Sequence, residues 1–476
     1  MFRLAAIALG LLPFLIAEWV CSVRGIGLPD QSVDPFVGFD SVNPLFVANP
    51  ETGRHEIAES RMLCFRPDSF QTLKPESEFR VFCLGGSTVQ GRPYAIETAF
   101  TTWFELSLRA ADPNRSFDVI NCGGISYATY RLVPIMEEVL NYEPDLIVLY
   151  TGHNEFLEDR SYATVKERSA TTRQLLRQAK RSRIFNFAYS KWNQLLAWRQ
   201  QVRPVLLPEE VQTRLDYAGG LQLYHRDLAW QQGVVEHFDF NVRRMIALCR
   251  DRDVPIWLVD PVCNLRSSPP FKSQNRDNLQ PDKKVEWDRL RNQASARFRT
   301  NVSGAIELLE AAMAIDDQHA GLAYDLGKAY ETIGDMTLAR QHFVRAKDLD
   351  ICPLRLIEKQ RERLHDIVVD LDVPLIDVNG MICRQSRNGI PGGFLLVDHV
   401  HPSISAHQDI AALLMETAIE TDIVKPSVGW QKRRDTAAAA HLAELDDRYY
   451  MDGQRRLEGL RSWTQGRVTM QRDEDH

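Results

Sequence analysis

Four residues suited to acyl-transfer chemistry follow apolar segments of the chain. Ser87 comes directly after a hydrophobic run and two glycines, which suits a nucleophile at a sharp turn. Asn154, in the loop 150–156, has a side-chain amide that can donate to an oxyanion, as can the backbone of the glycine loop 121–127. Asp398 and His401 are three residues apart, so the carboxylate can accept the imidazole Nδ1–H and leave Nε2 free to take the serine proton.

Each of these signals has an ordinary structural alternative when it is taken alone. A Gly-Gly-Ser-Thr segment is more often a turn or a helix cap than a nucleophile, and an asparagine in a loop usually forms an Asx turn. A glycine loop after a strand is often only a tight turn, and an aspartate near a histidine is often a surface pair. His399 competes for Asp398, but its spacing is too short for the same geometry. It is the combination that predicts a catalytic site.

The elements that must position these residues are short apolar runs, each ended by Gly, Pro or Asn. Five such runs are strand candidates: 79–85, 117–123, 145–152, 254–262 and 373–380. Helix-sized segments separate the first three, a pattern that predicts a parallel sheet covered on both faces. Ligands of open α/β sheets bind at the carboxyl ends of the strands, where all four candidate residues would lie.

In order and position, these segments resemble the SGNH hydrolase superfamily, also called GDSL esterases. The Gly-Asp-Ser block of that family reads Gly-Gly-Ser here, at 85–87, and its Gly-x-Asn-Asp block reads Gly-His-Asn-Glu, at 152–155. Its Asp-x-x-His block, usually followed by proline, is present at 398–402. The resemblance covers roughly 75–160, 250–264 and 370–420.

Three positions depart from the family pattern. Gly86 replaces the aspartate of the first block, and Glu155 replaces the aspartate of the third block. Ser126 stands where the second block has glycine, but that block supplies a backbone N–H, which every residue except proline has.

The resemblance implies a flavodoxin-like three-layer α/β sandwich with a five-stranded parallel sheet. It implies that Ser87 attacks an ester carbonyl, that His401 is the base, and that Asp398 orients it. The N–H groups of Ser87 and Ser126 and the amide of Asn154 would form the oxyanion hole. Three neighbouring residues are expected to contact the substrate: Gly86, Gly124 and His153. The mechanism requires no metal and no cofactor.

The rest of the chain divides into segments of different composition. Residues 1–25 contain an apolar stretch, 4–20, which predicts a signal anchor or transmembrane helix and an extracytoplasmic, membrane-anchored protein, or a secreted one if the segment is cleaved. The turn-rich segment 26–75 predicts an extended lead-in with little regular structure. The hydrolase-type domain is placed at 76–425, with a helical insertion at 160–250, and a charged helical tail follows at 426–476.

A second insertion, 284–353, has the pattern of a tetratricopeptide repeat. The matching positions are Leu326, Gly327, Tyr330, Ala339, Phe343 and Ala346, and the second-helix part recurs one repeat length earlier at Ala305, Leu309 and Ala312. An unrelated helical hairpin is the alternative. Such an insertion predicts packing on the main domain and a surface for a protein partner.

Composition excludes several classes of function. The net charge of −7 argues against a nucleic-acid partner. The eight cysteines include no CxxC pair, which argues against a zinc site, and Cys83, Cys122 and Cys263 are expected to be small core residues.

Three functions remain open from the sequence. The first is a serine-dependent ester hydrolase, acting on acyl esters or carbohydrate esters of the cell envelope or of glycans. The second is an O-acyltransferase with a glycan acceptor, since both reactions share an acyl-enzyme. The third is a non-catalytic interaction protein with a degenerate hydrolase fold and a repeat insertion. The complete set of serine, asparagine, aspartate and histidine favours the hydrolase.

Overall fold

The computed structural model divides the chain into two compact units, 1–43 with 160–208, and 44–159 with 209–476. The structure describes 44–158, 211, 213–216 and 219–465 of the second unit, and positions 14, 17–21, 183–184, 187 and 191 of the first. Among these residues no helix has the length and apolar character needed to cross a membrane. Most of the predicted anchor, 1–25, lies outside the described residues, and the anchor stays a prediction.

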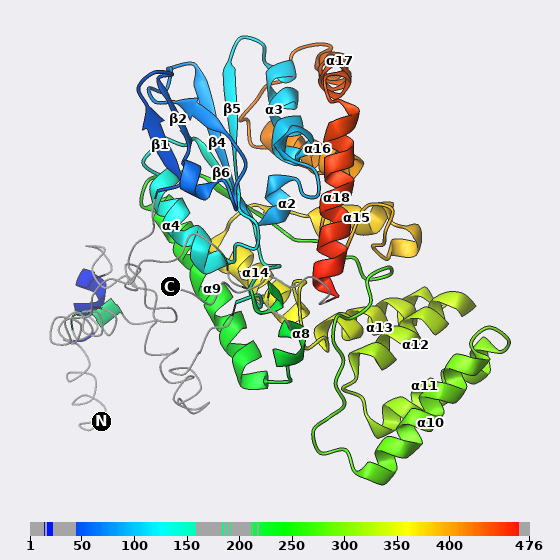
Figure 1. Ribbon diagram of the computed structural model, residues 1–476. Coiled ribbons are helices and arrows are strands. Elements are labelled where there is room, and N and C mark those ends of the chain that lie inside the picture. The colour runs from blue at the N-terminus through cyan, green and yellow to red at the C-terminus, as the bar shows by residue number, and fades with distance from the viewer. Residues whose placement is uncertain are drawn as a thin grey trace, which may run out of the picture. The chain divides into compact units, whose positions relative to one another are not determined.

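A five-stranded parallel sheet forms the centre of the second unit (Figure 1). Its strands lie in the order β5-β4-β6-β7-β8. The first strand of this sheet in chain order, β4, therefore lies between the second and the third, which is the flavodoxin-like order. The α/β class and the five-stranded parallel sheet are therefore confirmed. The strands span Glu78–Gly85 (β4), Ser116–Gly123 (β5), Leu146–Tyr150 (β6), Ile256–Val259 (β7) and Leu375–Ile376 (β8).

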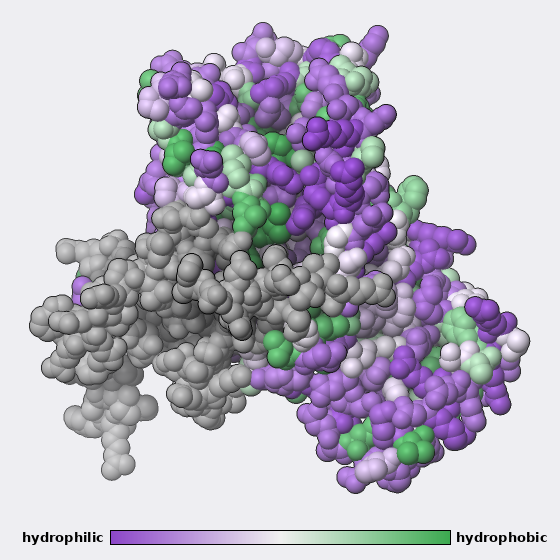
Figure 2. All heavy atoms as spheres, in the orientation of Figure 1, coloured by the Kyte–Doolittle hydropathy of each residue, from purple (hydrophilic) through white to green (hydrophobic). Residues whose placement is uncertain are grey.

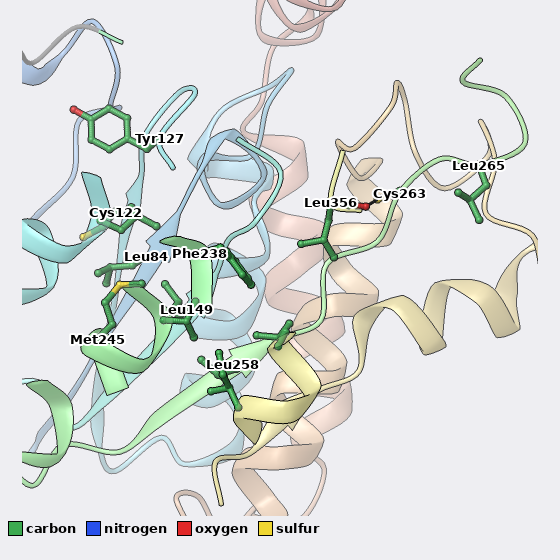
Figure 3. Close-up of a cluster of buried hydrophobic side chains, with 14 of the residues drawn as sticks. Leu84, Cys122, Tyr127, Leu149, Phe238, Met245, Leu258, Cys263, Leu265 and Leu356 are labelled. Carbon is green, nitrogen blue, oxygen red and sulfur yellow. Dashed lines mark hydrogen bonds between the residues drawn. The ribbon is translucent and has the colours of Figure 1, made fainter. Parts of the chain in front are cut away.

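Helices cover both faces of this sheet because alternate strand residues point to opposite sides and are apolar on each. One face packs on α3 (Phe100–Ala111) and α16 (Ile404–Glu420). The other face packs on α4 (Thr129–Val139) and α9 (Leu228–Arg250). Figure 3 shows the second core, in which Leu84, Cys122 and Leu149 of the strands lie beside Phe238 and Met245 of α9. Two further helices, α14 (Glu358–Leu371) and α15 (Val378–Gln385), flank β8 in the chain.

The burial predicted for three cysteines is confirmed. Cys83 and Cys122 are wholly buried in β4 and β5, and Cys263 is buried just after β7. Burial raises the pKa of each thiol, so the neutral thiol is the form that packs in the core.

The lead-in predicted at 26–75 contains regular structure over its described part, contrary to expectation. A three-stranded antiparallel sheet is formed by β1 (Phe46–Asn49), β2 (Arg54–Ile57) and β3 (Ser69–Gln71), with a short 3₁₀ turn η1 (Glu59–Arg61). The strands are too short to stand out among turn residues. They are held by Phe46 and Phe70, which pack in the main core, and by Glu138, whose carboxylate accepts the N–H groups of Leu45 and Phe46.

The helical insertion was predicted at 160–250, and its predicted C-terminal boundary is too late in the chain. Its last part, α9, belongs to the layer that covers the sheet, because Phe238, Val242 and Met245 are wholly buried against it. Two short elements precede α9 in the described residues, η3 (Arg214–Asp216) and α8 (Gly220–Leu223).

The second predicted insertion is helical. Its helices are α10 (Pro281–Arg297), α11 (Val302–Ile315), α12 (Ala320–Ile333) and α13 (Met336–Asp348). Gly327 allows α12 to pack closely on α13, because a Cβ there would lie 2.7 Å from the ring of Phe343. The insertion contacts the main domain through an ion pair between Arg266 and Glu331. Its assignment to the tetratricopeptide family stays a prediction.

The predicted charged tail forms two helices, α17 (Trp430–Ala443) and α18 (Asp447–Thr464). Their exposed surface is largely hydrophilic (Figure 2). On its inner side α18 packs against the segment that follows Ser87, since Gly453 approaches the ring of Tyr94 and the hydroxyls of Tyr449 and Thr98 lie 2.8 Å apart. The short 3₁₀ turns η2 (Ile96–Thr98) and η4 (Arg387–Gly389) complete the described elements.

Candidate active site

Ser87 is presented at the carboxyl end of β4, which lies between β5 and β6 in the sheet. It is the first residue of α2 (Ser87–Gln90), a single turn of helix. Gly85 passes so close to β6 that a Cβ would lie 2.1 Å from the carbonyl oxygen of Tyr150, and Gly86 then continues in an extended conformation. The two glycines therefore bring Ser87 to the point where the sheet order reverses, which is the usual ligand site of such sheets.

Ser87, His401 and Asp398 form a continuous chain of hydrogen bonds. The Oγ of Ser87 lies 2.7 Å from Nε2 of His401, and Nδ1 of His401 lies 2.6 Å from Oδ2 of Asp398. Asp398 and His401 lie in a tight loop that is closed by a bridge between Leu396 and Pro402. The geometry is the one expected for a serine activated by an oriented imidazole.

Asp398 is held as a carboxylate by its surroundings. Burial alone would raise its pKa, but the neighbouring histidines His401 and His399 and the hydrogen bonds to this side chain hold the pKa well below its usual range. Its Oδ1 accepts the backbone N–H groups of Val400 and His401, both at 2.8 Å. A fixed negative charge is thus available to stabilise an imidazolium at His401.

Asn264 holds the same loop from outside and was missed in the sequence. Its Nδ2 donates to the carbonyl oxygen of Asp398 at 2.7 Å. Its backbone N–H donates to the carbonyl oxygen of His399 at 2.9 Å. The signal that would have found it is its position, just after β7 at the same sheet edge as the triad. A cavity of about 530 Å³ opens beside this loop, lined in part by Asp398, Phe271 and Arg461.

His399 does not take the place of His401. Its Nδ1 lies 3.6 Å from Oδ1 of Asp398, beyond hydrogen-bond distance, and its ring packs edge-on against Phe271. Burial lowers the pKa of His399 to about 4, so this ring is neutral at neutral pH. The sequence-based choice between the two histidines agrees with this geometry.

Asn154, one of the donors predicted for the oxyanion hole, lies next to the glycine that precedes Ser87. Asn154 lies beside Gly86, where an added Cβ would come within 2.5 Å of the Asn154 Nδ2. That amide donates one N–H to the carbonyl oxygen of Tyr127 at 3.0 Å and retains a second N–H. Tyr127 adjoins Ser126, so the same hydrogen bond ties Asn154 to the loop that carries the Ser126 N–H. The absent aspartate side chain at Gly86 therefore leaves room for the Asn154 amide.

Ser126 has the left-handed conformation, with φ of 62°. This explains why a glycine suits the position, because a side chain there costs about 1 kcal/mol or more. We expect Ser126→Gly to keep esterase activity, since the N–H remains, and to leave the free energy of unfolding unchanged or slightly higher. Ser126→Val should lower it by about 1–3 kcal/mol. Urea unfolding of the two variants tests this, and equal stabilities would contradict it.

The other predicted site residues have mainly structural contacts. Glu155 accepts the N–H and the hydroxyl of Thr129 at 2.8 and 2.9 Å, so it caps α4. Gly124 donates to the carbonyl oxygen of Gly85 at 2.9 Å. His153 accepts the N–H of Leu356 at its Nδ1, and burial holds the pKa of His153 well below its usual range. Contact of Gly86, Gly124 and His153 with substrate stays a prediction.

Buried neutral histidines make the stability of this fold depend on pH. Burial lowers the pKa of His399 to about 4 and that of His407 to about 3, whereas the unfolded chain titrates near about 6.5. At these two sites the unfolded state thus binds more protons as the pH falls, and the stability that they contribute is lost from about pH 6.5 toward pH 4, by about 1.4 kcal/mol per unit of pKa difference. Burial raises the pKa of Asp68 and of Glu105 to about 7, and these carboxyl groups act in the opposite direction.

Urea unfolding at pH 7.5 and at pH 5 measures this loss. We expect a smaller dependence on pH in His407→Asn than in the parent chain, because one titrating group is removed. The same change in the free energy of unfolding between pH 7.5 and pH 5 in His407→Asn and in the parent chain would contradict the assignment of His407 as neutral.

Comparison with known proteins gives matches of structure only. No family model and no curated protein matches the sequence. A member of the lipolytic protein G-D-S-L family from Veillonella parvula is 9% identical, with 71% of this chain and 97% of that chain covered and a TM-score of 0.32. Axe2, an acetylxylan esterase from Geobacillus stearothermophilus, is 12% identical, with 71% and 93% covered and a TM-score of 0.31. At such identities the likeness concerns the fold alone.

Proposed function

We propose that this protein is a serine-dependent ester hydrolase of the SGNH type. The observation that carries the proposal is the hydrogen-bonded chain from Ser87 through His401 to Asp398, with Asn154 beside it. Asp398 holds Nδ1 of the imidazole protonated, which leaves Nε2 as the base that faces the serine hydroxyl. The four motifs that resemble the SGNH family all follow strands of the main sheet, and this supports the roles that the resemblance implies.

In the first step, Ser87 Oγ attacks the ester carbonyl carbon while Nε2 of His401 takes the hydroxyl proton. The negative charge that develops on the carbonyl oxygen is stabilised by the amide of Asn154 and by the N–H groups of Ser87 and Ser126. The bond between carbon and the leaving oxygen then breaks, and His401 returns the proton to that oxygen. A water molecule, deprotonated by His401, attacks the acyl-serine, and the acid and the free Ser87 hydroxyl are formed.

Replacing Asn154 by alanine should lower kcat for ester cleavage by about 100-fold or more, because one donor to the oxyanion is worth about 3 kcal/mol of barrier. KM should change little, since the charge develops only in the transition state. Steady-state kinetics with 4-nitrophenyl acetate measures both. Asn141→Ala is the control, because the Asn141 side chain donates to the carbonyl oxygen of Glu137 and accepts from Arg252, just after the C-terminal end of α4. Equal effects of the two substitutions on kcat would contradict the role of Asn154.

The proposed function is tested by covalent labelling with a fluorophosphonate. We expect the full chain to be labelled at Ser87, with no label in Ser87→Ala and weakened labelling in His401→Ala. Ser405→Ala is the matched control, because Ser405 is exposed and only four residues from His401. Absence of label on the parent chain would favour the non-catalytic alternative.

Hydrolysis and acyl transfer share the acyl-enzyme and differ in the acceptor. Product analysis with an acetyl ester, with and without a sugar acceptor, separates them: acetate alone indicates a hydrolase, and an acetylated sugar indicates a transferase. Esters of glycans or of the cell envelope, and a membrane-anchored location, are part of the same proposal, and they rest on the apolar segment 4–20.

A further inference from the structure

Three arginines from distant parts of the chain lie near the candidate active site. Arg92 follows the one-turn helix that begins at Ser87, and its N–H donates to the carbonyl oxygen of Ser87 at 3.1 Å. Arg456, on α18, donates from Nε to the carbonyl oxygen of Pro93 at 2.7 Å. Arg66 is the third. We call Arg66, Arg92 and Arg456 the arginine cluster.

The position of Arg66 follows from the contacts of the residues before it. The carbonyl oxygen of Cys64 accepts the N–H of Ile125 at 2.9 Å and the side-chain amide of Gln90 at 2.8 Å. The ring of Phe65 packs against Tyr127, with 4.9 Å between ring centroids. The segment that leads to Arg66 therefore lies between the loop carrying Ser126 and the end of α2.

The arginines of the cluster are close enough to affect one another. Burial, together with the charges of Arg66 and Arg456, lowers the pKa of Arg92 to about 10, while the charge of Asp398 acts in the opposite direction. Arg456 likewise has a lowered pKa, through burial and the charge of Arg66. The cluster is thus within electrostatic reach of the triad.

Few protein groups in the described ranges neutralise this charge. Arg66 and Arg92 make no side-chain hydrogen bond or ion pair with any described residue, and the Nε of each is shielded from solvent without an acceptor. Arg456 has two carboxylates, Asp452 and Glu97, within electrostatic reach. Asp398 is already occupied by His401 and by backbone N–H groups. Leaving a guanidinium group partly buried without an acceptor is costly, and the planar fork of arginine is suited to binding carboxylate and phosphate groups.

We propose that the arginine cluster binds an anionic group of the substrate, so that the ester cleaved at Ser87 carries a carboxylate, phosphate or sulfate on its acyl or its alcohol part. Guanidinium groups bind such oxyanions through charge-assisted and often paired hydrogen bonds. The ester-cleaving role of Ser87 is the proposed function on which this inference rests. The overall charge of the chain is −7, so the cluster is a local exception that selects a negative substrate.

The test compares matched esters that differ only in charge. One pair places the anion on the alcohol part: 4-acetoxybenzoate and its neutral amide, 4-acetoxybenzamide. The other places it on the acyl part: phenyl hydrogen adipate and its neutral amide, phenyl adipamate. We expect kcat/KM of the parent chain to favour the anionic member of at least one pair by about 10-fold or more. The pair that shows the preference identifies which part of the ester carries the anion.

Substitutions then assign the preference to the cluster. Arg92→Gln and Arg66→Gln should each reduce the ratio of kcat/KM for the anionic ester to kcat/KM for the neutral ester, and Arg92→Lys should retain part of this ratio. Arg455→Gln is the matched control, because Arg455 neighbours Arg456 but is exposed and paired with Asp452. The inference is overturned if neither pair shows a preference, or if the preference persists in the Arg66→Gln/Arg92→Gln double variant.

The proposed function and this inference fail in different ways. Turnover of the neutral esters tests the proposed ester-cleaving function. The preference of kcat/KM for the anionic ester tests the arginine cluster. If the parent chain cleaves no ester, calorimetric binding of 4-hydroxybenzoate to the parent and to the double variant tests the cluster by itself. Binding that is lost in the double variant supports the anion site, and absence of binding to the parent chain overturns it.

Discussion

Ser87→Ala should lower kcat for ester cleavage by about 10⁴- to 10⁶-fold, the largest loss expected from any single substitution in this chain. The physical reason is that the substitution removes the proposed nucleophile. The hydroxyl of Ser87 lies 2.7 Å from Nε2 of His401, whose Nδ1 is bound by Asp398. The residual rate would come from binding and from the oxyanion donors, which the substitution leaves in place.

This loss is measured by steady-state kinetics with 4-nitrophenyl acetate on variants whose folding is checked by urea unfolding. Ser405→Ala serves again as the control and should retain the parent rate. A Ser87→Ala variant that retains more than about a tenth of the parent kcat would show that another group performs the chemistry, because even a weakly placed nucleophile contributes more than tenfold.

Asp398→Asn should lower kcat by about 10⁴-fold, although it changes the shape of the side chain very little. At present the carboxylate accepts the Nδ1–H of His401 at 2.6 Å, while its other oxygen accepts two backbone N–H groups. Those two N–H groups will hold the oxygen of an asparagine in the same place. The amide nitrogen of asparagine then faces Nδ1 as a donor, so the imidazole protonates Nε2 instead and can no longer accept the serine proton.

The expected signature is a loss of kcat with little change in KM and with folding retained. Asp422→Asn is the control and should leave kcat unchanged, because Asp422 is an exposed carboxylate in the turn after α16. Because His399 lies 3.6 Å from the same carboxylate, a loss equal to that of Asp398→Asn in a His399→Asn variant would assign the paired imidazole to His399 and contradict the present choice.

Local sequence was sufficient to predict the strands of the main sheet. Each strand contains a short apolar run, and β4 ends at Gly85, where a glycine pair follows this run. The three-stranded sheet at 46–71 was missed because its strands have only three or four residues and owe their stability to partners far away, such as Glu138. The helix α9 was assigned to an insertion for a related reason, since only the tertiary structure shows which elements cover the sheet.

For the site, the sequence by itself determined which residue types are present and how Asp398 pairs with His401, because a separation of three residues fixes that contact locally. Only the tertiary structure decided that Ser87, more than three hundred residues earlier in the chain, meets His401, and that Asn154 lies beside Gly86. The arginine cluster, too, could not be predicted from the sequence. Arg66, Arg92 and Arg456 share no motif, and they lie near one another because α18 folds back on the segment after Ser87, through packing that no local pattern encodes.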